Sequence, residues 1–173
     1  MIKKFLPQKM YRDIYLLTPE YMKAHNLKGI ITDLDNTLIR WDKPDATPEI
    51  RAWFQQFIDA GIQVVVCSNN NEKRVKIFAD QVGLPFVFKA RKPLVRGFKR
   101  AQQLMGLESH EIIVIGDQLM TDVFGGNRGG FHTILVAPLV KTDEWKTYLN
   151  RKMEKVIMRR FQKKNLANWE EHS

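Results

Sequence analysis

Cysteine is almost missing from this sequence, since Cys67 is the only one among 173 residues. A single cysteine excludes an intramolecular disulfide and argues against a cysteine-based zinc site. This scarcity suits a reducing compartment. Because Cys67 ends an apolar run, we expect it to be a small buried residue of the core.

Long apolar segments are missing too. No stretch approaches the ~18 apolar residues that a membrane-spanning helix needs, and no apolar segment of signal-peptide length follows the basic start, residues 1–7. The sequence shows no internal repeat and no long linker rich in Gly, Ser or Pro. Hydrophobic residues make up 44% of the chain, which is ordinary for a globular protein. We therefore expect one soluble, cytoplasmic domain over residues 1–173.

Positive charge, in contrast, is abundant. The chain holds 28 Lys and Arg against 19 Asp and Glu, a net charge of +9, which favours anionic partners without choosing among nucleic acid, anionic lipid and phosphorylated metabolites. Residues 141–165 carry nine basic and three acidic side chains. We predict a basic amphipathic helix and tail over 141–173, which packs on the domain or lies on an anionic membrane. Its apolar residues at helical spacing are Trp145, Tyr148, Leu149, Met153, Val156, Ile157 and Phe161.

Short apolar runs alternate with helical patterns along the rest of the chain. The runs are mostly β-branched and continuous, which is typical of strands buried on both faces of a parallel sheet. This alternation predicts a Rossmann-like, doubly wound α/β fold with a mainly parallel sheet. Residues 1–28 precede it as an N-terminal extension. The predicted strands are 29–32, 62–67, 86–88, 112–115 and 133–136, and the predicted helices are 48–60, 72–82 and 93–105.

Two details of this pattern can be checked directly. In the third helix, Leu94, Phe98, Ala101 and Met105 are expected to point inward. The glycine-rich segment 125–130 matches neither a dinucleotide-binding nor a P-loop pattern. We interpret it as a turn-rich connection into the last strand.

Polar residues follow four of the predicted strands. Because the carboxyl ends of parallel strands meet at one edge of the sheet, these residues are expected to converge. Carboxylates suit Mg²⁺, which is bound by hard oxygen ligands, while lysine, hydroxyl, amide and backbone N–H groups suit phosphate. The sequence therefore predicts a divalent cation holding a phosphate. The residues at the strand ends are Asp33 and Asp35, Ser68 and Asn69, Lys92, and Asp117 and Asp122.

These motifs carry a family resemblance. Asp-Leu-Asp-Asn-Thr, Ser-Asn, Lys-Pro and Gly-Asp-x-x-x-x-Asp, in this order over residues 29–137, resemble the haloacid dehalogenase (HAD) phosphatase superfamily. The segments Arg-Asp-Ile-Tyr, Cys-Ser-Asn-Asn and Gly-Asp-Gln-Leu-x-Thr-Asp look more narrowly like its YqeG type. That type is capless, belongs to subfamily IIIA and is similar to mitochondrial phosphatidylglycerophosphate phosphatases.

The resemblance implies a role for each site residue. Asp33 would be the nucleophile that forms an aspartyl-phosphate and a ligand of Mg²⁺. Asp35 would act as general acid and then as general base, with its backbone carbonyl on the metal. Asp117 would be the second side chain on the metal, and Asp122 would orient the metal's waters or the lysine. Phosphate would be bound by Ser68, Asn69 and Lys92.

The spacing between motifs also bears on the substrate. Only 33 positions separate Asp35 from Ser68, and 24 separate Ser68 from Lys92, which leaves no room for a cap domain. An open site could admit a lipid head group. The resemblance implies a Mg²⁺-dependent phosphate monoester hydrolase. Together with the open site and the basic segment, it implies phosphatidylglycerophosphate as substrate and peripheral contact with the inner face of an anionic membrane through residues 141–165.

Two alternatives stay open at this point. The first is a phosphatase of the same superfamily that acts on a soluble phosphoester. The second is an RNA- or ribosome-binding protein that uses the charge of +9. Basic residues interleaved with an apolar stripe favour lipid over RNA, whose readers present aromatic stacking platforms. The oligomeric state is not set by any of these patterns.

Overall fold

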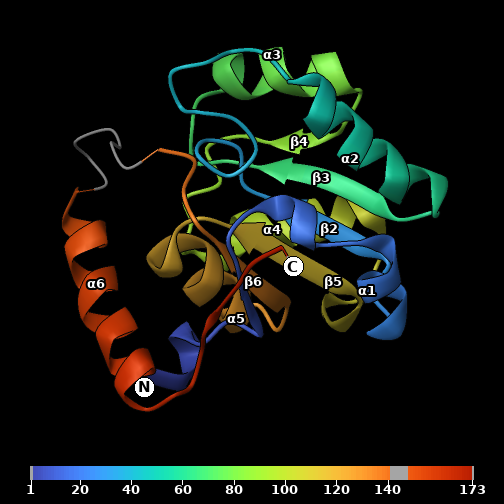
Figure 1. The fold of residues 1–173 in the computed structure, drawn as a ribbon. Helices are drawn as coiled ribbons and strands as arrows, with labels where there is room; N and C mark the ends of the chain where they lie inside the picture. The colour runs from blue at the N-terminus through green and yellow to red at the C-terminus, as the bar shows by residue number, and fades with distance from the viewer. Residues whose placement is uncertain (1, 141–147, 173) are drawn as a thin grey trace.

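The computed structural model describes residues 2–140 and 148–172. In this part of the chain, seven strands form one sheet in the order β4-β3-β2-β5-β6-β1-β7, and all neighbouring pairs are parallel (Figure 1). The chain winds outward in opposite directions from the two central strands, so the predicted doubly wound α/β fold is confirmed. The strands are β1 (Lys9–Tyr11), β2 (Gly29–Thr32), β3 (Gln63–Cys67), β4 (Phe86–Val87), β5 (Ile112–Gly116), β6 (His132–Val136) and β7 (Trp169–Glu170).

The central strands are buried on both faces. Successive side chains of a strand point to opposite faces, so Ile30 belongs to one apolar cluster and Ile31 to another. This two-sided burial explains why the strands are continuous apolar runs in the sequence. Cys67 lies in the second cluster and is fully buried, as predicted.

Helices cover both faces of this sheet (Figure 1). Buried residues of α1, α2 and α3 share the cluster of Ile30, and those of α4 share the cluster of Ile31. The prediction for Leu94 was wrong: this residue precedes the helix in an extended conformation and is 53% exposed. Its side chain therefore does not follow the helical period. The helices are α1 (Pro19–Ala24), α2 (Pro48–Asp59), α3 (Glu72–Val82), α4 (Val95–Met105), α5 (Phe124–Arg128) and α6 (Tyr148–Lys163).

The glycine-rich segment is more regular than expected, because its first part forms the short helix α5. A Cβ atom on Gly125 would lie 2.6 Å from the ring of Phe98, and one on Gly126 would lie 2.7 Å from the methyl group of Thr133. These glycines permit close packing of α5 on the sheet and on α4. A left-handed backbone appears only later in the segment, at Gly130 (φ +79°).

Segments near both ends of the chain complete the far side of the sheet. β1 lies between β6 and β7, and the sequence pattern predicted neither β1 nor β7. The predicted C-terminal helix is present as α6, at one side of the sheet (Figure 1), while residues 141–147 of that prediction lie outside the described residues. Phe161 of α6 is fully buried in a cluster with Met10 and Leu119. Among the described residues, none of the helices has the length and apolar character to cross a bilayer.

Candidate active site

A cavity of about 570 Å³ opens at the carboxyl ends of the central strands. It lies where the winding of the sheet reverses, between β2 and β5, which is where open α/β sheets bind ligands. Five of the side chains singled out from the sequence line it together with residues of the neighbouring loops. The five are Asp33, Asp35, Ser68, Asn69 and Lys92.

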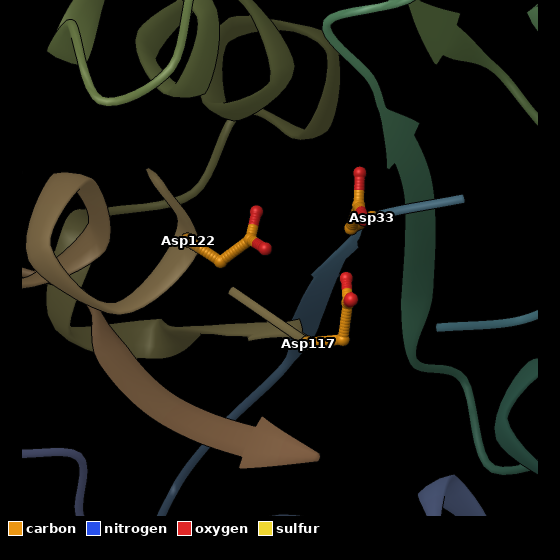
Figure 2. A group of neighbouring side chains, drawn as sticks. All are labelled: Asp33, Asp117 and Asp122. Carbon is orange, nitrogen blue, oxygen red and sulfur yellow. The ribbon is translucent and has the colours of Figure 1, made fainter. Parts of the chain in front are cut away.

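Three carboxylates gather beside this cavity. One oxygen each of Asp33, Asp117 and Asp122 lies within 4.8 Å of the other two (Figure 2). Asp33 follows β2 and Asp117 follows β5, whereas Asp122 lies within the π-helical turn Leu119–Val123 that comes next. A cluster of hard oxygen donors at this separation fits a divalent cation such as Mg²⁺.

The electrostatics of the cluster favour an added cation. Burial, together with the charge of Asp33, raises the pKa of Asp117 well above its usual range, against the opposing effect of Arg151. Burial likewise raises the pKa of Asp122 to about 6, although Lys92 opposes the shift. Because burial disfavours the charged carboxylates, a divalent cation placed among them would stabilise the ionised forms.

The side chain of Lys92 brings a positive charge into the carboxylate cluster. Its buried Nζ donates to Asp33 Oδ1 at 2.8 Å and to Asp122 Oδ1 at 2.6 Å. Burial alone would lower the pKa of Lys92, but the charges of Asp122 and Asp33 outweigh it and raise that pKa above its usual value. The ammonium group therefore stays charged between two of the three clustered carboxylates.

Asn69 and Ser68 form the loop that supports this lysine. The Asn69 amide accepts from the Lys92 backbone N–H at 2.7 Å and donates to the Lys92 carbonyl at 3.1 Å. Ser68 Oγ accepts from the Asn70 backbone N–H at 3.1 Å. In this structure Asn69 thus holds the main chain of Lys92. Ser68 accepts the hydrogen bond from Asn70, so that bond does not use the hydrogen of the Ser68 hydroxyl.

Asp35 also lines the cavity and is paired with a cation of its own, Arg74. Arg74 donates to Asp35 Oδ1 through Nη2 at 2.7 Å and Nε at 3.0 Å, and Asn70 Nδ2 donates to Oδ2 at 3.0 Å. Burial raises the pKa of Asp35, and the hydrogen bonds from Asn70 and Arg74 oppose that rise. The side chain is 22% exposed, so it can exchange protons with a ligand in the cavity.

Two further side chains complete the arrangement. Thr37 Oγ1 lies 3.3 Å from Asp33 Oδ2 and 3.1 Å from Asp117 Oδ1, so one hydroxyl links two carboxylates. Arg151 of α6 donates to Asp117 Oδ2 at 2.5 Å. The sequence patterns did not single out Thr37, Asn70, Arg74 or Arg151. Thr37 and Asn70 belong to motifs that were recognised in the sequence. The contacts of the two arginines depend on where their helices pack.

Comparison with known proteins places these residues in a family. Residues 30–90 match the haloacid dehalogenase-like hydrolases, and residues 89–159 match the HAD-hydrolase-like family. The chain is 50% identical over 172 residues to the probable phosphatase YqeG of Bacillus subtilis (strain 168), covering 99% of this chain and 100% of that protein. It is 27% identical over 176 residues to phosphatidylglycerophosphate phosphatase 1 (chloroplastic/mitochondrial) of Arabidopsis thaliana, covering 93% of this chain but 49% of that protein.

A solved structure is similar in fold. The cobalt-bound deoxy-D-mannose-octulosonate 8-phosphate phosphatase of Haemophilus influenzae superposes with a TM-score of 0.54 at 19% identity, covering 79% of this chain and 90% of that one. At this low identity the likeness concerns the fold alone. The full-length similarity to YqeG is much higher, and the HAD-type matches span the residues that form the carboxylate site. This chain is therefore a phosphatase of the haloacid dehalogenase superfamily and belongs to its YqeG group.

Proposed function

We propose that this protein is a Mg²⁺-dependent phosphate monoester hydrolase that works through an aspartyl-phosphate on Asp33. The observation that carries the proposal is the cluster of Asp33, Asp117 and Asp122 within 4.8 Å, with the Lys92 ammonium paired to two of them. Mg²⁺ bound there, by the side chains of Asp33 and Asp117 and the carbonyl of Asp35, would neutralise charge and hold a phosphate oxygen.

Each residue of the site then has a separate role in the reaction. An Asp33 carboxylate oxygen attacks phosphorus, the bond from phosphorus to the leaving oxygen breaks, and Asp35 gives that oxygen its proton. In the second half, Asp35 takes a proton from water as the water oxygen attacks phosphorus, which releases phosphate and restores Asp33. The raised pKa of Asp35 supports its starting as the acid. Lys92 and the Ser68 hydroxyl would bind the equatorial oxygens, with Asn69 and Asp122 holding the lysine.

We propose a lipid phosphate, of the phosphatidylglycerophosphate kind, as the substrate. Residues 36–91, all described by the structure, form only a loop, α2, β3, α3 and β4, so no cap domain inserted there covers the cavity. The exposed Trp41 forms part of the cavity lining. The relative from Arabidopsis thaliana is named for activity on phosphatidylglycerophosphate. An uncovered cavity lets a head group enter while its acyl chains stay in a bilayer.

The outer face of α6 fits an anionic bilayer. Leu149, Met153 and Val156 are 68%, 45% and 53% exposed, and their spacing places them in one stripe along the helix. Lys152, Lys155 and Arg159 lie beside that stripe, by the same helical geometry. Each basic residue near an anionic surface contributes ~1 kcal/mol. We therefore propose peripheral docking of α6 on the cytoplasmic face of a membrane, next to the cavity that Asn150 helps to line.

Phosphate release tests the catalytic part of the proposal. The assay compares phosphatidylglycerophosphate in mixed vesicles with a nucleotide, a sugar phosphate and an aryl phosphate, with Mg²⁺ and with a chelator. We expect Mg²⁺-dependent release that is fastest on the lipid, and loss of turnover by ~10⁴-fold or more in Asp33→Asn. Phosphate release that the chelator does not reduce would refute the role of the metal. Faster release from a soluble ester would refute a lipid phosphate as the substrate.

Vesicle co-sedimentation tests the docking part. The double variant Leu149→Ser/Met153→Ser should lose binding to vesicles rich in phosphatidylglycerol, while hydrolysis of a soluble aryl phosphate is retained. Leu104→Ser is the matched control, because Leu104 is 57% exposed on α4 and should not affect binding. Equal binding by both variants would contradict docking through α6. Stronger retention on RNA than on vesicles at equal salt would favour the nucleic-acid alternative.

A further inference from the structure

A side chain from the first turn of α6 contacts a residue of the carboxylate cluster. Arg151 Nη2 donates to Asp117 Oδ2 at 2.5 Å, and Arg151 Nη1 donates to the Asp117 backbone carbonyl at 2.9 Å. The Asp117 side chain is fully buried, and the Arg151 side chain is 19% exposed. One planar guanidinium thus contacts both the side chain and the main chain of Asp117, which restrains its orientation as well as balancing its charge.

A second residue of α6 supports the same contact. Glu154 is 7% exposed; its Oε1 accepts from the Met120 backbone N–H at 3.2 Å and its Oε2 accepts from Arg151 Nη1 at 3.1 Å. The helix itself is anchored by Phe161, which is fully buried. α6 therefore contacts the segment 117–122 at two points, and Glu154 restrains the arginine that makes the first.

Asp117 is consequently held from two sides. Thr37 donates to its Oδ1 at 3.1 Å, while Arg151 donates to its Oδ2. Thr37 belongs to the loop after β2 and Arg151 to α6, so two separate parts of the fold set the rotation of one carboxylate. An oxygen that accepts one hydrogen bond keeps a lone pair for another partner. The arrangement therefore leaves the carboxylate able to bind a cation in the space that it shares with Asp33 and Asp122.

We propose that Arg151 is a positioning residue for the metal site, which orients Asp117 from α6. The inference rests on the proposed function, because it concerns Mg²⁺ binding at Asp117. Two effects of removing Arg151 oppose each other: loss of a nearby positive charge strengthens cation binding, whereas loss of a partner that orients a ligand typically weakens it by ~10–100-fold. Positioning dominates, and the net effect of Arg151→Gln is weaker Mg²⁺ binding by about tenfold.

Calorimetric titration of the whole chain with Mg²⁺ alone tests this inference. Lys155→Gln is the matched control, because Lys155 is exposed on the same helix one turn later and its loss removes the same charge. We expect about tenfold weaker binding in Arg151→Gln and unchanged binding in Lys155→Gln. Unchanged or tighter binding in Arg151→Gln would overturn the positioning role. Absence of Mg²⁺ binding by the unmodified chain would instead overturn the proposed metal-dependent function.

A conservative variant keeps the test decisive if Arg151→Gln fails to fold. Arg151→Lys retains the charge but loses the planar fork, and circular dichroism with thermal unfolding checks its fold. We expect its Mg²⁺ affinity to lie between those of Arg151→Gln and the unmodified chain. Its turnover of a soluble aryl phosphate should be low at limiting Mg²⁺ and recover at saturating Mg²⁺. A loss of turnover that saturating Mg²⁺ does not restore would contradict a role through the metal ligand.

Discussion

Two arginines reach the site from different helices, and they hold two different carboxylates. Arg74, on α3, pairs with Asp35, whose side chain is 22% exposed. Arg151, on α6, pairs with Asp117, whose side chain is fully buried. The difference matches the proposed chemistry, because an acid that exchanges protons with substrate needs access to the cavity, whereas a metal ligand needs a fixed orientation.

The largest effects should come from removing the two carboxylates themselves. Asp35→Asn should lower kcat by ~10²–10⁴-fold, the usual contribution of a general acid, with Mg²⁺ affinity retained, because its proposed metal contact is the backbone carbonyl. Asp117→Asn should weaken Mg²⁺ binding by ~100-fold or more, beyond the usual cost of losing an outer partner. Calorimetry and steady-state kinetics on both variants provide the comparison. Equal loss of metal binding in the two would show that they do not have separate roles.

A smaller effect is expected from Arg74. Arg74→Gln should lower kcat about tenfold, as is typical for a residue that orients a reacting group, with Mg²⁺ affinity unchanged. Because Arg74 opposes the rise in the pKa of Asp35, its loss should let that pKa rise further. The alkaline limb of the kcat/KM profile, where Asp35 loses its proton, should therefore move to higher pH.

The matched variant for this test is Arg151→Gln, which should leave the alkaline limb in place. Arg74→Lys should restore part of the turnover, since it keeps the charge but not the planar geometry. If both arginine variants moved the limb equally, the two pairs would not be separable and the proposed division between acid and metal ligand would fail.

The smallest effect lies away from both arginines, at the start of β6. Burial, aided by the charge of His25, lowers the pKa of His132 to about 4, and His132 Nε2 lies 2.8 Å from the Tyr21 hydroxyl. The unfolded chain takes up this proton near pH 6.5 and the folded chain does not, so stability falls as pH drops from about 6.5 towards 4. Because the ring is only partly buried, we expect a loss of about 1 kcal/mol.

Urea unfolding at pH 7.5 and pH 5.0 measures this loss. His132→Gln should reduce the difference between the two pH values by about 1 kcal/mol. His110→Gln, at an exposed position, should leave the difference unchanged. An identical pH dependence in the unmodified chain and His132→Gln would contradict the assignment. The result also separates pH effects on stability from pH effects on the site.

The comparison of the two arginines also shows how far the sequence predicts the site. Asp33, Asp35 and Lys92 were found because each follows an apolar run in a parallel sheet, a topology that brings strand ends together. Arg74 and Arg151 were missed because their partners lie 39 and 34 residues away. Nothing in the local pattern of either helix marks which polar residue contacts a carboxylate of the site.

The fold, too, was predicted in some parts and missed in others. The central strands are continuous apolar runs and were predicted, and so was the two-residue β4, because it lies in the apolar run 86–88. β1 has three residues and β7 has two, and neither lies in such a run. Their pairing depends on distant contacts, such as Lys9 beside Ile134 and Met10 beside Trp169. Leu94 was misplaced because the helix begins at Val95, two residues later than predicted, so that Leu94 precedes its first turn.

Both outermost strands of the sheet, β4 and β7, are only two residues long. At the β7 side, Lys9 pairs with Glu170 at 2.6 Å and Arg12 with Glu171 at 2.8 Å. Short edge strands expose few unpaired backbone N–H and C=O groups. Together with charged side chains at the edge, this disfavours edge-to-edge aggregation. A highly apolar parallel sheet is thereby protected against joining its neighbours into fibrils.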